Sequence, residues 1–73
     1  MSRPDIAELS AFVAVAERRS FAKAALHLGI SRSSLSETIR RLEERLGVRL
    51  LNRTTRSVSP TEAGSRLLTR LHP

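Results

Sequence analysis

Apolar residues recur along much of the chain at the three- and four-residue spacing of amphipathic helices. The first such stretch runs from Ile6 to about Arg19. Asp5 precedes it and Glu8 follows three positions later, a capping-box pattern with aspartate in the serine or threonine place. We expect this helix to serve as scaffold. Its predicted buried side consists of Ile6, Leu9, Phe12, Val13 and Ala16.

The next two predicted helices are separated by a short glycine turn. Ser20 is placed to end the first helix and to cap the second, over about residues 21–28. Gly29 then breaks the pattern, and Ser31 can cap a third helix over about residues 32–46. This arrangement is typical of a helix-turn-helix, whose second helix enters the DNA major groove. The residues that define it are Phe21, Ala24, Ala25, Leu28, Gly29, Ile30, Ser31, Leu35 and Ile39.

The third predicted helix has two different sides. At about 100° per residue, one arc about 60° wide is apolar, and it consists of Leu35, Ile39, Leu42 and Leu46. A separate arc carries short hydroxyls and long charged side chains: Arg32, Ser33, Ser36, Glu37 and Arg40. Such an arc suits a groove about 12 Å wide, but an ordinary solvated face has the same composition. The preceding turn and the following hairpin favour groove binding. Gly47 is well placed to end this helix in a left-handed conformation.

A small basic hairpin is predicted after this helix. Residues 48–52 and 57–59 look like two short strands, with residues 54–56 at the tip. No acidic residue lies between Arg45 and Thr61, whereas this stretch contains several arginines. Beside a groove-binding helix such a hairpin is a wing, able to lay arginine along the backbone or into the minor groove. The alternative is a basic surface hairpin without a partner.

A fourth helix is predicted at the end of the sequence. Pro60 should stop the second strand, and Thr61 should cap the helix, with Glu62 favourably placed in the first turn. One side of this helix is apolar and consists of Ala63, Leu67, Leu68 and Leu71. Two interpretations remain open. The leucines can contact a partner helix, which would make Leu67, Leu68 and Leu71 dimerisation residues, or the helix can fold back onto its own domain.

Composition supports an anionic partner. The 73 residues predict one domain, and 13 basic against 7 acidic side chains give a net charge of +6. All but one of the basic residues are arginine, which suits phosphates and guanine edges, although a high genomic GC content produces the same bias.

The absence of cysteine excludes disulfides and thiolate metal sites and fits a reducing compartment. Without a membrane-length apolar run or a signal peptide, we expect a cytoplasmic, nucleoid-associated protein.

Other classes of function fit the sequence less well. An enzyme needs titratable or metal-binding side chains that converge on one site. The only histidines of the chain are His27 and His72, and its acidic residues lie mostly among arginines. We therefore expect neither catalysis nor a metal site. The stronger rival is a winged helix that binds protein. Aromatic or apolar residues on the exposed arc of residues 32–46 would favour it, and that arc has none.

The chain resembles the N-terminal DNA-binding domain of LysR-type transcriptional regulators, over about residues 5–70 and without an evident gap. The molybdate-responsive regulators have a similar domain, but the short wing and the segment 53–64 fit LysR better. In chain order the matching residues are Leu9, Phe12, Val15, Ala16, Glu17, Ser20, Phe21, Ala24, Ala25, Leu28, Ile30, Ser31, Leu35, Ser36, Ile39, Leu42, Glu43, Leu46, Gly47, Arg53, Arg56, Thr61, Ala63 and Gly64.

The resemblance implies a mainly α winged helix-turn-helix, with a three-helix core, a short β-hairpin wing and the start of a linker helix. Residues 1–60 would be the DNA-binding domain and residues 61–73 the beginning of the linker and dimerisation helix. The implied partner is one half of an interrupted palindromic operator in double-stranded DNA, with residues 32–46 in the major groove and residues 53–57 at the minor groove. The full-length protein would be a homodimer or tetramer, and this fragment a monomer or weak dimer. The resemblance places the small-molecule effector in an absent C-terminal domain, so we expect no cofactor here.

The resemblance also assigns individual residues. Those expected at bases are Arg32, Ser33, Ser36, Glu37 and, in the minor groove, Arg56. Those expected at phosphates, through hydroxyls, helix N-terminal amides or cations, are Ser20, Ser31, Thr38, Arg40 and Arg53. The chain departs from the family at Arg32 and Ser33, where glutamine and proline are common, and at Glu37, where a basic or polar residue is frequent. Glu37 can accept from a cytosine amino group or pair with Arg40 or Arg41, and both alternatives remain open.

Overall fold

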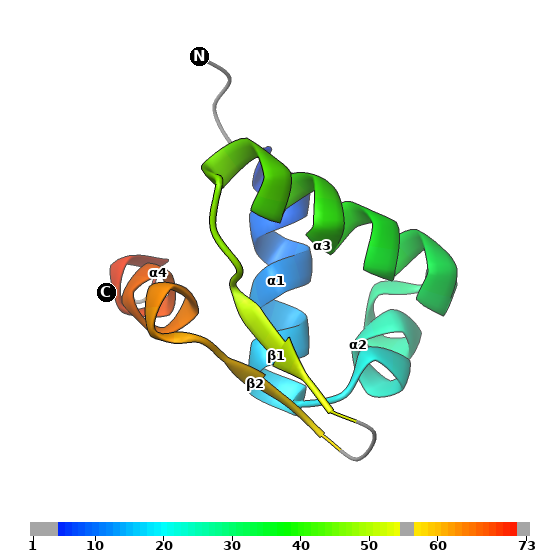
Figure 1. Ribbon diagram of the computed structural model, residues 1–73. Helices are drawn as coiled ribbons and strands as arrows, with labels where there is room; N and C mark the ends of the chain where they lie inside the picture. The colour runs from blue at the N-terminus through cyan, green and yellow to red at the C-terminus, as the bar shows by residue number, and fades with distance from the viewer. Residues whose placement is uncertain (1–4, 55–56, 72–73) are drawn as a thin grey trace.

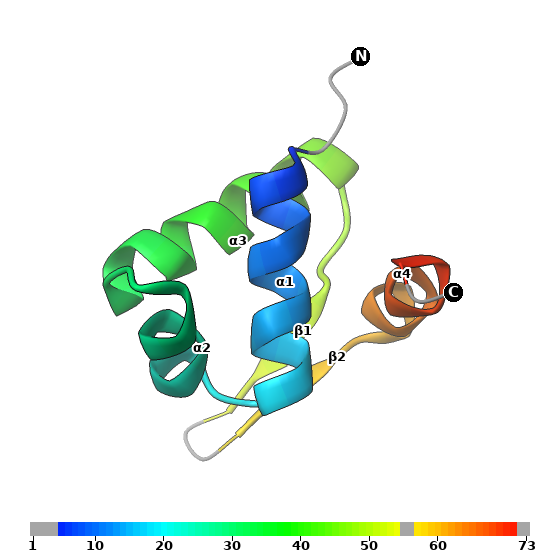
Figure 2. The ribbon, with the colours of Figure 1, turned by 180° about the vertical axis from the view of Figure 1, so that it is seen from behind.

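The computed structural model describes residues 5–54 and 57–71. Figures 1 and 2 show α1 in the middle of the molecule, with α3 crossing it and α2 packed beside the start of α3. The two-stranded hairpin lies along α1, and α4 lies on the side away from α2. This is the mainly α winged helix-turn-helix that the sequence predicts. Its elements are α1 (Ile6–Arg18), α2 (Phe21–Leu28), α3 (Arg32–Leu46), β1 (Leu51–Arg53), β2 (Val58–Pro60) and α4 (Glu62–Leu71).

The boundaries of α2 and α3 follow from local capping. The Ser20 hydroxyl oxygen accepts a hydrogen bond from the backbone N–H of Lys23 at 3.1 Å. The Ser31 hydroxyl oxygen does the same for Ser34 at 3.0 Å. Gly29 ends α2 with φ 71°, a left-handed conformation that costs glycine little. These caps fix both helix starts and the turn between them, as predicted.

The hydrophobic core lies where α1, α2, α3 and the hairpin meet. It consists of Ala11, Phe12, Ala14, Val15, Ala16, Ala24, Ala25, Leu35, Ile39, Leu42, Leu50, Leu51 and Val58. Two predicted core positions are wrong: Ile6 is 80% exposed and Leu46 is 38% exposed. Each occupies an end of its helix, the first residue of α1 or the last of α3. We attribute the exposure to this position, because the end of a helix has packed neighbours on fewer sides.

A buried carboxylate links the start of α1 to the end of α3. The Glu8 side chain accepts a hydrogen bond from the backbone N–H of Asp5 at 3.2 Å, as the capping-box pattern predicts. Glu8 is only 6% exposed, and its Oε1 lies 3.7 Å from Nε of Arg45. The pairing with Arg45 satisfies a charge that would be costly to bury alone. The sequence pattern predicted the cap but not this second role.

The first strand is shorter than predicted. It covers Leu51–Arg53 rather than residues 48–52, and the backbone where it begins is bonded to α3. Glu43 Oε2 accepts the N–H of Leu50 at 2.8 Å and that of Leu51 at 3.2 Å. These backbone groups are therefore held by a side chain of α3.

The second strand begins one residue later than predicted and includes the residue expected to stop it. It starts at Val58, and the antiparallel register places Pro60 opposite Leu51. Proline lacks an N–H group, so it is tolerated at the end of an edge strand. Ser57, expected within this strand, precedes it.

Helix α4 is capped as predicted, and its capping residue is also bonded to the segment before β1. Thr61 Oγ1 accepts the N–H of Gly64 at 3.0 Å and donates to the carbonyl of Arg49 at 2.6 Å. Leu67, Leu68 and Leu71 are partly buried against the domain core, as the fold-back interpretation expects. Dimerisation through these leucines stays a prediction, as does the division of the chain at residues 60 and 61.

Candidate nucleic-acid interface

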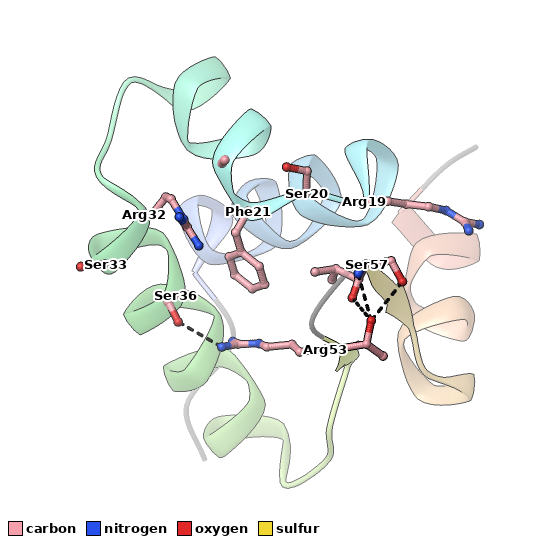
Figure 3. A pocket seen from close by; sticks show the side chains of 11 residues that line it. Arg19, Ser20, Phe21, Arg32, Ser33, Ser36, Arg53 and Ser57 are labelled. Carbon is pink, nitrogen blue, oxygen red and sulfur yellow. Dashed lines mark hydrogen bonds between the residues drawn. The ribbon is translucent and has the colours of Figure 1, made fainter.

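An open groove of about 640 Å³ lies between the start of α2, the N-terminal half of α3 and the hairpin (Figure 3). We call it the α3–hairpin groove. It brings together Arg32, Ser33 and Ser36, three of the residues predicted to meet bases. Ser20 and Arg53, predicted at phosphates, line it too. The full lining is Arg19, Ser20, Phe21, Ala22, Arg32, Ser33, Ser36, Arg53, Thr54, Ser57 and Val58.

The orientation of α3 follows from its two-sided sequence. Leu35 and Ile39 are fully buried, which fixes the rotation of the helix about its axis. Ser36 is rotated by about 100° from its neighbour Leu35 and lies on another side of the helix. Arg32, the first residue of α3, borders the apolar side and is exposed. Figure 3 shows Arg32 and Ser36 directed into the α3–hairpin groove, whereas the hydroxyl of Ser33, also in the lining, points to the outer side of α3.

One arginine connects the three elements around the groove. Arg53, at the end of β1, donates from Nη1 to the hydroxyl oxygen of Ser36 in α3 at 3.1 Å. Its Cζ lies 4.4 Å from the ring centroid of Phe21, the first residue of α2, within the range of a cation–π contact. Figure 3 shows this side chain spanning from the hairpin to α3. The wing is thus joined by side chains to both helices of the helix-turn-helix.

The α3–hairpin groove is electropositive. Arg19, Arg32 and Arg53 contribute three cations, and none of the described lining residues is acidic. A concave surface lined by one sign of charge raises the local concentration of an oppositely charged ligand. The planar guanidinium forks can bind phosphate oxygens or the major-groove edge of guanine. The groove is therefore suited to an anionic ligand with a regular backbone.

Glu37 is paired and does not line this groove. Its Oε1 accepts from Nη2 of Arg40 at 2.7 Å, one helical turn along. This hydrogen bond and the positive charge of Arg40 lower the pKa of Glu37, and the same contact raises the pKa of Arg40. Pairing with Arg40 is thus the alternative present in the structure. Contacts of Glu37 with a base and of Arg40 with a phosphate stay predictions.

The other predicted phosphate contacts are arranged differently. Ser31 caps α3, and Thr38 donates its hydroxyl to the carbonyl of Ser34 at 2.9 Å, so both side chains bond to their own helix. Neither lines the α3–hairpin groove. Arg56, predicted to enter the minor groove, lies outside the described residues. The structure therefore brings some of the predicted DNA-contacting residues together in the α3–hairpin groove and leaves others outside it.

Three polar groove residues were assigned no individual role, although Thr54 and Ser57 lie within the predicted wing, residues 53–57. Arg19 follows α1 in a left-handed conformation with φ 53°, unusual for a residue other than glycine. At the hairpin, Thr54 Oγ1 donates to the carbonyl of Ser57 at 3.0 Å and accepts the N–H of Ser57 at 2.9 Å. Hydroxyl residues near a tight turn favour such bonds, which is a signal that the sequence contained. Helical periodicity gives no comparable signal for Arg19.

Two further structural results concern the described part of the chain. No three histidine, cysteine, aspartate or glutamate side chains within it lie close enough together to hold a metal ion. None of its helices combines the length and the apolar character needed to cross a membrane.

Comparison with known families gives a match over most of the chain. Residues 6–65 match the model described as "Bacterial regulatory helix-turn-helix protein, lysR family". A curated relative, the HTH-type transcriptional regulator PgrR of Escherichia coli K12, is 62% identical over 73 residues, which is 100% of this chain and 24% of the relative. The chain spans about a quarter of the length of the curated relatives it matches.

Two solved structures illustrate the likeness in three dimensions. The H2O2-bound C206S mutant of Corynebacterium glutamicum OxyR superposes with a TM-score of 0.92 at 46% identity, over 94% of this chain and 21% of the other. The crystal structure of a BenM_DBD/catB site 1 DNA complex superposes with a TM-score of 0.87 at 42% identity, over 90% of this chain and 73% of the other. The second of these neighbours was solved on DNA.

Proposed function

Because the chain belongs to the lysR family of bacterial regulatory helix-turn-helix proteins, we propose that it binds double-stranded DNA as the DNA-binding domain of a transcriptional regulator. Helix α3, residues 32–46, lies in the major groove, and the wing, residues 53–57, lies at the minor groove. The duplex supplies the regular anionic backbone that the α3–hairpin groove is suited to bind.

One observation carries this proposal: an arginine and a serine hydroxyl at the start of α3 face the same groove as a wing arginine. Arg32 and Ser36 come from α3, and Arg53 comes from β1. Nothing apolar is needed on this side of α3, because Leu35, Ile39 and Leu42 are buried on another side. A helix so arranged can contact base edges while the hairpin and the helix N-termini contact phosphates. The solved DNA complex of a 42% identical neighbour further supports this docking.

The wider role rests on the family and on the length of the relatives. We propose that one copy binds one half of an interrupted palindromic operator, because closed two-fold oligomers read two-fold symmetric sites. The whole protein is then a cytoplasmic homodimer or tetramer, and Leu67, Leu68 and Leu71 belong to its dimerisation helix. This domain uses no cofactor, and a small-molecule effector binds elsewhere in the longer protein. The role is regulation without catalysis.

Selection of bound sequences from a random duplex pool, followed by titration of the selected half-site at several salt concentrations, tests the proposal. Phosphate contacts release counterions, so the logarithm of the binding constant should fall linearly with the logarithm of salt concentration. A slope of about −4 corresponds to four or five neutralised phosphates. A flat salt response together with no enriched sequence would contradict DNA binding.

Two arginines provide a matched pair of variants. Arg32 lines the α3–hairpin groove, whereas Arg70 lies in the last turn of α4 and is absent from that lining. Arg32→Ala should weaken binding to the selected half-site by about 5- to 100-fold, the range expected for one arginine at a base edge. Arg70→Ala removes the same charge and should change affinity less than about twofold, as expected of a distant surface charge. Equal losses would mean that net charge alone drives binding.

A further inference from the structure

We propose that Arg53 is a positioning residue that makes Ser36 a hydrogen-bond donor toward an acceptor atom on a base edge. This inference rests on the proposed DNA-binding function and adds a rule for base preference. Arg53 is predicted at the phosphate backbone, where it would attract any sequence equally. Its contacts in the structure give it a second role, exerted through Ser36.

Two contacts hold the Arg53 guanidinium beside Ser36. Nη1 donates to the Ser36 hydroxyl oxygen at 3.1 Å, and Cζ lies 4.4 Å from the centroid of the Phe21 ring. The ring restricts where the planar group can lie, so the hydrogen bond does not depend on a freely moving side chain. Ser36 itself, in α3, is half-buried. The pair therefore presents one preferred arrangement to a ligand in the groove (Figure 3).

The chemistry of the hydroxyl follows from this arrangement. A serine hydroxyl has one hydrogen to donate and two lone pairs that accept. The Arg53 N–H occupies a lone pair, which leaves the hydroxyl hydrogen free to point elsewhere. The adjacent positive charge also disfavours a second donor at the same oxygen and favours an electron-rich acceptor. Ser36 is thereby set to donate into the groove.

A donor at this position distinguishes bases in the major groove. Guanine offers N7 and O6, adenine N7 and thymine O4 as acceptors, whereas cytosine presents only its N4 amino donor. The base facing Ser36 should therefore be guanine, adenine or thymine, and cytosine should be disfavoured. A serine without a neighbouring cation can either donate or accept, and it would discriminate less against cytosine.

The test compares base preferences rather than affinity alone. Sequences are selected with the wild-type chain, Ser36→Ala, Arg53→Ala and the double variant, and affinities are then measured for the selected half-site and its single-base changes. Arg49→Ala is the control. Arg49 is exposed, lies just before the hairpin and does not line the α3–hairpin groove. Circular dichroism during thermal unfolding verifies that each variant folds.

We expect the wild type to disfavour cytosine about fivefold at one base position, the amount that one net hydrogen bond provides. Ser36→Ala should abolish this preference. Arg53→Ala should abolish it as well, and should also weaken binding to all sequences and make the salt slope about one unit shallower. In the Ser36→Ala background, Arg53→Ala should cause only the uniform loss, because the two residues act as one unit. Arg49→Ala should retain the preference.

The outcomes separate this inference from the proposed function. If Arg53→Ala weakens all sequences equally and keeps the preference that Ser36→Ala removes, Arg53 is only a backbone contact and the inference fails. It fails equally if Ser36→Ala leaves every base preference unchanged. In both cases DNA binding itself stands. If the wild type neither enriches a sequence nor responds to salt, the proposed function fails first.

Discussion

Helices α3 and α4 are both two-sided, yet their apolar sides are covered to different degrees. In α3, Leu35, Ile39 and Leu42 are fully buried. In α4, only Gly64 is buried, and the leucines pack partly against the core. The difference shows which side of each helix is left accessible to a ligand or a partner. Helix α3 satisfies its apolar side within the domain and offers its polar side to a ligand, whereas α4 retains accessible apolar area.

The sharpest test of this comparison removes one large side chain from each helix. Ile39→Ala should lower the free energy of unfolding by about 3 kcal/mol, because a fully buried side chain leaves a cavity. Leu67→Ala should cost about 1 kcal/mol, because a partly exposed side chain gives up less buried area. Urea unfolding followed by circular dichroism measures both. Similar losses in the two variants would show that the two apolar sides contribute alike.

The next test concerns the one buried residue of α4. A Cβ on Gly64 would collide with the backbone carbonyl of Leu50. Alanine normally favours a helix over glycine by about 1 kcal/mol. Here we expect Gly64→Ala to destabilise the domain by about 1–3 kcal/mol, the usual cost of overpacking. Ser65→Ala, on an exposed neighbour, should stay within about 0.5 kcal/mol of the parent in thermal unfolding. A stabilised Gly64→Ala variant would mean that α4 is not packed tightly against the hairpin.

The smallest expected effect concerns the polar side of α3. The Arg40 guanidinium lowers the pKa of Glu37, so NMR titration of the Glu37 carboxyl should give a value below that of an ordinary glutamate. Arg40→Gln should return the pKa toward the ordinary value. A carboxylate with a lowered pKa stabilises the folded state above its unfolded pKa, and this contribution is lost as the pH falls through the folded pKa. Both groups are exposed, so solvent screening keeps the change in stability small. An unshifted Glu37 would show that the pair does not persist in solution.

The helices could be predicted from the sequence because their boundaries are set by neighbouring residues. Ser20 and Ser31 each cap a helix by bonding to the residue three positions later. Gly29 ends α2 at the position where the apolar pattern breaks. The first strand is less well predicted, and the backbone N–H groups where it begins bond to Glu43, a side chain in another element. Local periodicity gives no information about such a bond.

The same distinction applies to the candidate site. Arg32, Ser33 and Ser36 were predicted because they share one side of a helix, and the structure places all three in the α3–hairpin groove. The contact of Arg53 with Ser36 joins residues 17 positions apart, so neither helical nor strand periodicity indicates it. Arg19 enters the groove through a left-handed backbone conformation that its residue type does not favour. A contact between elements and an unusual backbone conformation thus account for the roles of Arg53 and Arg19 that were missed.

The Glu43 carboxylate, which accepts two backbone N–H groups at the base of the hairpin, has a mechanical consequence for an operator. It ties the start of the hairpin to α3 in the free protein, so in the proposed DNA complex the angle between the two is set in advance. A duplex whose two grooves do not match that angle has to deform. Readily kinked pyrimidine–purine steps between the two contacts would lower the deformation energy, so base pairs that no side chain touches would contribute to operator choice.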